Sequence, residues 1–212
     1  MDLFSYFRSS AAYRTRIALA FKGLEYNYRA VHLVRGEQRS EQYREVNPQG
    51  VVPTLVDGQA TIVQSLAQLE YLEEKYPDPP LLPKDLAARA RVRGLSLVVA
   101  CDIHPLQNMP LGRYLQREFG ATEAQVQASR AYFTAGGLQT LEQLLAGSPE
   151  TGSFCHGEHP SLADVCLVPQ LANAARFGLD LGEYPTLQRI GATCDHLPAF
   201  LAAHPSRQPD AE

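Results

Sequence analysis

Cysteine is scarce in this chain of 212 residues, and its four copies are widely spaced. Cys101, Cys155, Cys166 and Cys194 form no C-x-x-C pair and no ligand cluster with the six histidines. Zinc sites and dithiol redox centres need such spacing, so the sequence predicts neither, and we expect no metal. The thiols are expected to be reduced, as they are in the cytosol.

Long apolar runs and an excess of one charge are also missing. No segment approaches the roughly 20 apolar residues that a membrane span needs, and no basic region followed by an apolar stretch indicates a secretory signal. The net charge of -4 gives no reason to expect nucleic acid or an acidic membrane surface as a partner. A hydrophobic content of 45% with 20% charged residues is typical of a globular protein, and we expect it in the cytoplasm.

Apolar spacing and turn residues predict a β-α-β-α-β-β-α order for the first 80 residues. The expected strands are 2–7, 26–33, 52–56 and 60–63, and the expected helices are 10–22, 40–46 and 65–76. Gly23 stands where a C-terminal helix cap would, and Asp57-Gly58 is a strong hairpin signal. Ser65-Leu66-Ala67-Gln68 is interpreted as a capping box that opens the third helix. The first strand–helix–strand unit favours parallel pairing of its two strands, and the hairpin adds two antiparallel strands. We therefore expect a mixed four-stranded sheet.

The rest of the chain is predicted to be helical. A proline-rich stretch indicates a linker over residues 77–85. The expected helices are 86–119, 122–146, 161–177 and 186–203. Thr122 opens a second capping box and Ser161 a close variant, whereas Pro105 and Pro110 should kink or break the first of these helices. We therefore expect an α/β domain over 1–80 followed by an all-α domain over 86–212.

The start of the first helix carries the clearest candidate site. A short apolar run leads into Ser9 and Ser10, and an arginine-rich helical pattern follows. Two hydroxyls and the unpaired N–H groups of a helix start can bind an anion, including a thiolate. The alternative is structural, with Ser10 as an ordinary N-cap and Ser9 as linker.

Several segments resemble the glutathione transferase superfamily. Val52-Pro53-Thr54-Leu55 before a hairpin and Gln64-Ser65 at a helix start are similar to its thioredoxin-like domain, in which the proline is cis. The segments that resemble the zeta class are 8–19, 101–108, 167–170 with 173–177, and 204–210. The likeness spans residues 2 to about 210. One departure is Ala11, where the zeta pattern often has cysteine; bound glutathione would supply the sulfur instead.

The resemblance implies a glutathione-dependent cis–trans isomerase for a maleyl dicarboxylate, in which glutathione is a coenzyme that is not consumed. Thiolate addition, bond rotation and elimination would carry out the reaction. Maleylacetoacetate is the preferred substrate, because Met109-Pro110 stands where some maleylpyruvate isomerases carry further arginines. The alternatives are maleylpyruvate as substrate, a general glutathione transferase, and a non-catalytic interaction protein. Family members are usually dimers, so a homodimer is expected.

The resemblance also assigns residues to the site. Ser9, with Ser10 as second candidate, would contact the glutathione sulfur. The other glutathione-binding residues would be Gln38, Val52, Pro53, Gln64, Ser65, His104 and Asn108. Arg8 and Arg176 would hold the substrate carboxylates, since a guanidinium binds a carboxylate through two parallel hydrogen bonds. Each of three residues also has a structural alternative. Gln38 could be a solvated loop residue, His104 could be a structural residue hydrogen-bonded within the fold, and Arg176 could cap the last carbonyls of its helix.

Overall fold

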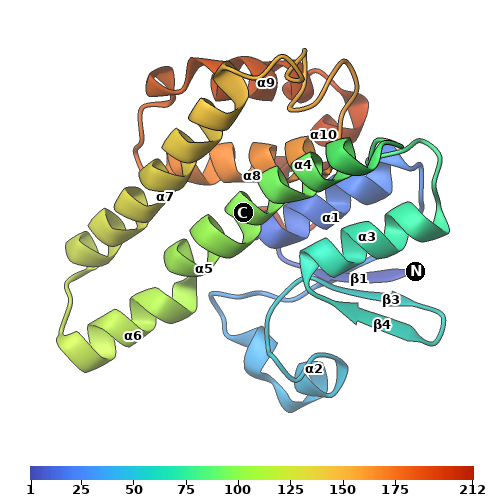
Figure 1. Ribbon diagram of the computed structural model, residues 1–212. Helices are drawn as coiled ribbons and strands as arrows, with labels where there is room; N and C mark the ends of the chain where they lie inside the picture. Colours follow the sequence, from blue (N-terminus) through green and yellow to red (C-terminus); the bar gives the residue numbers. More distant parts are fainter. The chain divides into compact units, whose positions relative to one another are not determined.

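The computed structural model describes residues 1–212, and its first compact unit, residues 1–81 with 195–212, contains a four-stranded sheet (Figure 1). Its elements are β1 (Asp2–Ser5), α1 (Ser10–Phe21), β2 (Asn27–Ala30), α2 (Glu41–Val46), β3 (Thr54–Asp57), β4 (Ala60–Val63), α3 (Ser65–Lys75) and α10 (Pro198–Ala203). The order predicted for the first 80 residues is confirmed.

The sheet is mixed, with the strand order β2-β1-β3-β4. β1 pairs in parallel with β2, placing Leu3 opposite Tyr28. β3 pairs antiparallel with both β1 and β4, and Leu3 also faces Leu55. The β3–β4 hairpin turns at Gly58, whose φ of 61° lies in the left-handed region that glycine adopts without strain. The predicted mixed four-stranded sheet is confirmed.

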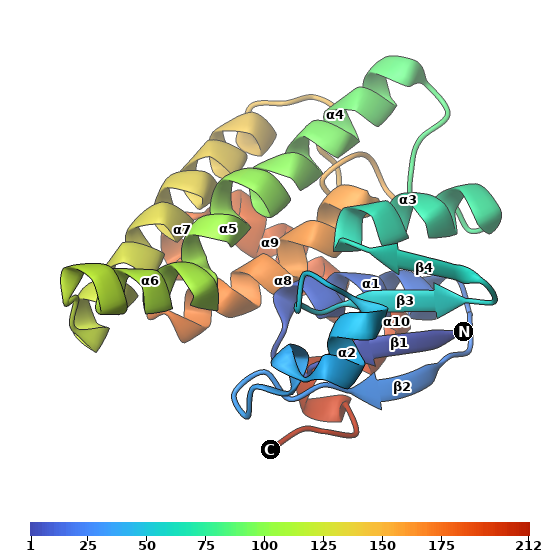
Figure 2. The ribbon, with the colours of Figure 1, turned by 90° about the horizontal axis from the view of Figure 1, so that it is seen from below.

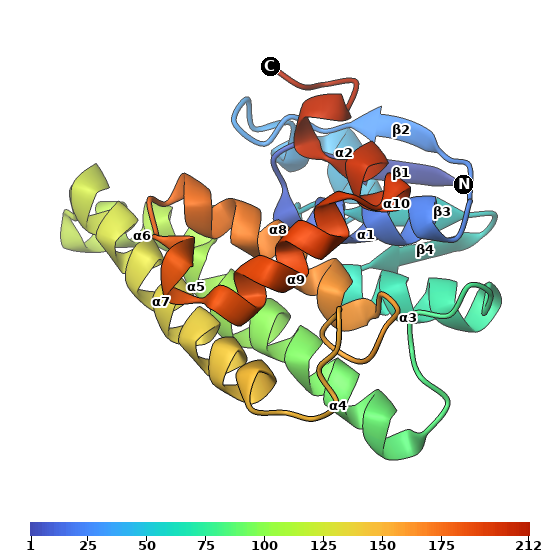
Figure 3. The ribbon, with the colours of Figure 1, turned by 90° about the horizontal axis from the view of Figure 1, so that it is seen from above.

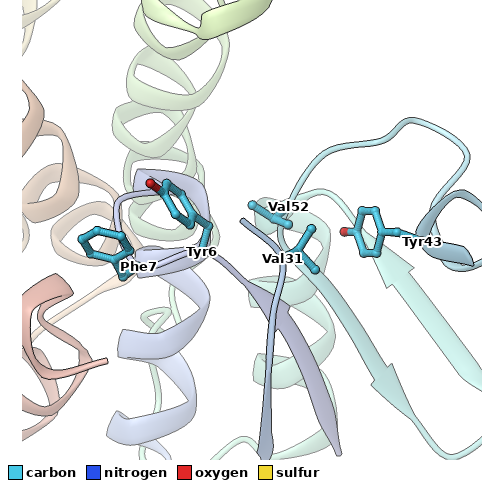
Figure 4. Packing of buried hydrophobic residues seen from close by; sticks show 5 residues of the cluster. All are labelled: Tyr6, Phe7, Val31, Tyr43 and Val52. Atoms are coloured by element: carbon cyan, nitrogen blue, oxygen red, sulfur yellow. The ribbon is translucent and has the colours of Figure 1, made fainter. Parts of the chain in front are cut away.

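Helices cover both faces of this sheet. Figures 1 and 2 show α1 and α3 on one face and α2 on the other, and Figure 3 shows α10 beside α1. Ile17 and Leu19 of α1 are fully buried. A second set of buried side chains, Tyr6, Phe7, Val31, Tyr43 and Val52, packs together around the loops at the sheet edge (Figure 4). The central strands β1 and β3 are the best covered, whereas the edge strand β2 stays mostly exposed.

The second unit, residues 82–194, is helical. Its elements are α4 (Leu86–Leu97), a π-helical segment (Val98–Ile103), α5 (His104–Gln107), α6 (Met109–Phe119), α7 (Glu123–Ala146), α8 (Leu162–Arg176) and α9 (Pro185–Asp195). None of the helices in the structure has the length and apolar character to cross a bilayer. The capping boxes expected at Thr122 and Ser161 are both formed.

The long helix expected over 86–119 is interrupted, as predicted from Pro105 and Pro110. Asn108 is extended, with φ −76° and ψ 157°, and separates α5 from α6. Pro105 and Pro110 lie in the first turns of these two helices, where a missing N–H costs no helical hydrogen bond. α7 packs closely on the π-helical segment, since a Cβ on Gly137 would lie 2.1 Å from Ile103 Cγ1.

Two expectations for the end of the chain differ from the structure. The single helix predicted over 186–203 is wrong: α9 and α10 are separate helices, and Pro198 lies in the first turn of α10. Residues 195–212, which were expected in the all-α domain, pack with the first unit instead. Arg16 of α1 accounts for this packing in part, because its Nε donates to the carbonyl of Ala203 at 3.1 Å.

Candidate functional site

Four loops that carry predicted site residues leave the sheet at one edge. The parallel strands β1 and β2 end there, at Ser5 and Ala30. Because β3 runs in the opposite direction it begins there, at Thr54, and β4 returns to the same edge at Val63. The helices that follow β1 and β4 therefore both begin at this edge. Two helix N-termini, each with partial positive charge and unpaired N–H groups, favour anions.

Ser9 caps α1. Its Oγ accepts a hydrogen bond from the Ala12 N–H at 3.2 Å, and its own N–H donates to the carbonyl of Tyr6 at 2.9 Å. The alternative with Ser10 as the cap is therefore wrong, since Ser10 is the first helical residue and is buried. Capping uses a lone pair of the Ser9 oxygen, so the hydroxyl proton can be donated to an anion such as a sulfur.

Arg8 lies next to this cap and is exposed. Its guanidinium rests over the ring of Phe7, 5.0 Å from the ring centre. This cation–π contact leaves Arg8 exposed to solvent. The position is compatible with binding a carboxylate beside Ser9.

Ser65 is the first residue of α3 and is buried. Arg14, which is 1% exposed, donates from Nη1 to Ser65 Oγ at 3.2 Å. A positive charge thus lies next to a serine that was predicted to bind glutathione. Arg14 is not among the predicted site residues, although a charged residue inside the buried run Tyr13 to Leu19 is an informative signal.

The capping box predicted at Ser65 is wrong. Gln64 occupies the N-cap position with φ 68°, and its side chain makes no capping bond. Gln68 is fully buried and serves other groups: it accepts from Thr15 Oγ1 at 2.7 Å and donates to the carbonyls of Pro53 and Ile62. Gln64 is exposed, and its Nε2 donates to Gln49 Oε1 at 2.8 Å. A positive φ at a non-glycine residue is a backbone strain of the kind that concentrates at functional sites.

Val52 and Pro53 lie in the loop before β3, and the peptide bond between them is cis, as the resemblance implied. The N–H and C=O of Val52 have no hydrogen-bond partner in the chain. Its side chain packs with Tyr6 and Val31 (Figure 4). The main chain of Val52 can therefore pair with an extended peptide.

Gln38 lies in the short 3₁₀ turn Glu37–Arg39 and is 6% exposed. Its Nε2 donates to the carbonyl of Leu33 at 3.2 Å, while its Oε1 is buried and has no partner. A buried acceptor without a donor is costly, so this oxygen is suited to receive an N–H from a ligand. The solvated alternative for Gln38 is wrong.

Three predicted site residues belong to the second unit: His104, Asn108 and Arg176. His104 begins α5 and is half-buried, and Asn108 caps α6 by accepting the Met109 N–H at 2.9 Å. Gln107, between them, exchanges two hydrogen bonds with Gln170 of α8, at 2.7 and 2.9 Å. This buried amide pair, which no local sequence pattern predicted, fixes α5 against α8.

Arg176 is the last residue of α8 and is exposed. Its Nη2 donates to Asn173 Oδ1 at 2.8 Å, and its guanidinium lies 5.4 Å from the centre of the Phe177 ring. These contacts orient the side chain without burying its charge. The guanidinium is therefore accessible to a carboxylate.

The sequence matches family models along most of its length. Residues 1–74 match the glutathione S-transferase N-terminal domain, and residues 123–205 match the C-terminal domain. The maleylacetoacetate isomerase of Pseudomonas aeruginosa is 46% identical over 213 residues, covering 99% of this chain and 98% of that protein.

Solved structures are similar over the full chain. A maleylpyruvate isomerase described as a bacterial zeta-class glutathione S-transferase matches with a TM-score of 0.98 and 43% identity, covering 100% of both chains. A maleylacetoacetate isomerase from Methylobacterium extorquens AM1, solved with bound malonate and glutathione, matches with a TM-score of 0.97 and 40% identity, also covering 100% of both chains.

Proposed function

The chain belongs to the glutathione S-transferase family, in its zeta class, and from this premise we propose that it is a glutathione-dependent cis–trans isomerase that converts maleylacetoacetate to fumarylacetoacetate. The observation that carries the proposal is the likeness to proteins named maleylacetoacetate isomerase over essentially the whole of both chains. Degradation of an aromatic compound is the setting in which such a substrate arises.

The residues at the sheet edge fit glutathione as coenzyme. The buried Oε1 of Gln38 has no hydrogen-bond donor, and the N–H and C=O of Val52 beside Pro53 make no hydrogen bond within the chain. Both can therefore bind the backbone of a peptide such as glutathione. We assign the glutamyl carboxylate of glutathione to Gln64 and to Ser65, where Arg14 adds a positive charge. His104 and Asn108 are assigned to glutathione binding from the second unit.

When bound, glutathione supplies the thiolate that adds to the cis double bond and leaves after rotation. Ser9 stabilises the sulfur as thiolate by donating its hydroxyl proton, because its oxygen is already held by the Ala12 N–H. The N-terminus of α1 adds partial positive charge at the same point. Ser10 is the second candidate for this contact. Removing a preorganised donor of this kind typically costs on the order of 10²-fold in rate.

The substrate carries two carboxylates, and we assign them to Arg8 and Arg176. Both guanidinium groups are exposed and rest against a neighbouring aromatic ring. Each presents a planar fork to a carboxylate and so orients the substrate as well as binding it. The malonate bound in the Methylobacterium enzyme is a dicarboxylate of the same chemical class.

Maleylpyruvate is the second candidate substrate, because a structural relative carries that name. Met109-Pro110 after Asn108 favours maleylacetoacetate, since the chain adds no cation there for a smaller substrate with closer carboxylates. The test is the ultraviolet loss of each maleyl substrate with and without glutathione. We expect glutathione-dependent isomerisation with a higher kcat/KM for maleylacetoacetate; equal rates without glutathione would contradict the coenzyme role.

We further propose that the protein is a homodimer in the cytosol. None of the four cysteines forms a disulfide, which suits a reducing compartment. Tyr132 is 74% exposed and, with Phe133 and Val98, lines a hollow of about 430 Å³ on the helical unit. A second copy covering this apolar surface would explain its exposure. Light scattering is expected to give twice the chain mass, and Tyr132→Glu is expected to give the monomer.

A further inference from the structure

The turn that leads into α1 is held from two sides. Ser9 N–H and Arg16 Nη1 both donate to the carbonyl of Tyr6, at 2.9 and 3.3 Å. The next carbonyl, that of Phe7, accepts from Arg16 Nη2 at 3.1 Å. The Phe7 N–H donates to Asp210 Oδ2, also at 3.1 Å. The main chain immediately before Arg8 and Ser9 is therefore fixed by one buried cation and one carboxylate.

Arg16 is fully buried. Its Nη1 also donates to Ser5 Oγ, and its Nε donates to the carbonyl of Ala203. Burial lowers the pKa of its guanidinium, and nearby tyrosines and the Asp210 carboxylate oppose that fall. Asp210 therefore stabilises the charge that holds the turn, in addition to contacting the turn itself.

Asp210 comes from the far end of the chain. Its Oδ1 accepts a hydrogen bond from the Tyr28 hydroxyl at 2.5 Å, which anchors Asp210 to β2. Gln208 fixes the approach by donating to the carbonyls of Ala202 and His204, at 3.0 and 2.9 Å. Figures 2 and 3 show this segment passing beside β2. The segment 204–210, one of those that resemble the zeta class, has no role in the reaction proposed above.

We propose that Asp210 is a positioning residue: with Arg16 it fixes the Tyr6–Ser9 turn, so that the Ser9 hydroxyl is aimed at the glutathione sulfur. The inference rests on the proposed function of Ser9 and deepens it. It gives the last residues of the chain a part in thiolate formation, although no side chain among them needs to contact glutathione.

A positioning role and a purely electrostatic role predict opposite effects on the thiol. If Asp210 acted only through its negative charge, removing that charge would make a nearby thiolate more stable and lower the thiol pKa. If Asp210 positions the turn, losing the Phe7 contact misaims Ser9 and raises the thiol pKa. Small misplacements of a catalytic group reduce rates by about tenfold to 10²-fold.

The experiment compares Asp210→Ala, Asp210→Asn and the control Glu212→Gln. Asparagine keeps an acceptor for the Phe7 N–H without the charge. Glu212 lies in the same segment but binds His32 and Arg35 rather than the turn, and it is half exposed. Ultraviolet thiolate absorbance of the full-length protein with glutathione, titrated against pH, gives the thiol pKa. Calorimetry gives the glutathione affinity, and turnover of the maleyl substrate gives kcat.

We expect Asp210→Ala to raise the thiol pKa and lower kcat at least tenfold, with glutathione affinity changed less than threefold. Asp210→Asn should recover most of the kcat, and Glu212→Gln should match the wild type. An unchanged or lowered thiol pKa in folded Asp210→Ala would overturn the inference, even if the wild type isomerises its substrate. If Asp210→Ala does not fold, failure of Asp210→Asn to keep the thiol pKa within about half a unit of the wild type would overturn it.

The thiol pKa does not depend on which substrate the enzyme turns over. A wild type that binds glutathione but isomerises no maleyl compound would contradict the proposed function and leave the pKa comparison decisive for Asp210. A wild type that binds no glutathione would overturn both.

Discussion

Arg14 and Ser65 are joined by a buried hydrogen bond of 3.2 Å at the place where α1 and α3 both begin. The bond connects the two helix starts that face the same sheet edge, one assigned to the sulfur of glutathione and the other to its glutamyl carboxylate. Because Arg14 is nearly inaccessible to water, its charge is screened little and acts strongly on a nearby anion.

Arg14→Lys is expected to weaken glutathione binding by about tenfold, since a charge-assisted hydrogen bond contributes about 1.5–3 kcal/mol. The thiol pKa of bound glutathione should stay unchanged, because Ser9 is intact. Calorimetry on Arg14→Lys, Ser65→Ala and the double variant measures the coupling. Additive losses would show that Arg14 does not act through Ser65.

Ser9→Ala is expected to affect both stability and the thiol. Loss of the N-cap should lower the free energy of unfolding by about 1 kcal/mol, and loss of the donor should raise the thiol pKa and reduce turnover by about 10²-fold. Ser40→Ala is the matched control, because Ser40 caps α2 by the same 3.2 Å bond, to the Tyr43 N–H. The control should lose stability alone. A thiol titration that does not move in Ser9→Ala would point to Ser10.

Gln64→Gly is expected to increase stability while weakening glutathione binding. Glycine relieves the strain of φ 68°, which costs about 1–3 kcal/mol, and gives back about 0.5–1 kcal/mol through its freer unfolded chain. A net gain of about 1 kcal/mol in urea unfolding should accompany a weaker Kd by calorimetry. If Gln64→Gly is destabilised and binds normally, neither the strain nor the role of the amide stands.

Much of this fold followed from local patterns. Gly23, the Asp57-Gly58 turn and the prolines at 105 and 110 each act within a few residues, and the structure agrees with all of them. Helical spacing alone failed over 186–203, where Pro198 begins a separate helix. The failed capping box at Ser65 has a long-range cause: Gln68 is drawn into the core by Thr15 and two carbonyls. A local pattern cannot register that competition.

The site was predictable to the extent that it depends on adjacent residues. Ser9 and Gln64-Ser65 stand at helix starts, and the sequence identifies those starts. Arg14 and Asp210 act on residues 51 and 203 positions away, so only the assembled sheet edge reveals them. Gln107 and Gln170 are likewise paired across 63 positions.

The carboxylate of Asp57 is expected to make the free energy of unfolding depend on pH in acid. Hydrogen bonds from Lys75 and Tyr71 lower its pKa below the ordinary value of 3.8. Because the folded-state pKa is depressed, the stabilisation is present above about pH 4 and is lost as the pH falls through the folded-state pKa. Asp57→Asn keeps a good hairpin turn, so only this pair is removed. Urea unfolding should show a deficit of about 0.5 kcal/mol at pH 7 that shrinks below pH 4; a deficit independent of pH would exclude the ion pair as its cause.

The variant Arg176→Lys tests whether Arg176 binds a carboxylate of the substrate. Arg176→Lys keeps the positive charge but loses the planar fork and the stacking on Phe177, 5.4 Å from the guanidinium. Turnover should fall by about tenfold or more, while calorimetry should find glutathione affinity nearly unchanged, because the residue serves the other ligand. The defect should be largest for the dicarboxylate and smallest for a neutral maleyl ester, since only a carboxylate uses both arms of the fork. Equal losses with the ester and the diacid would assign Arg176 a structural role instead, in which its bond to Asn173 holds the end of α8 in place.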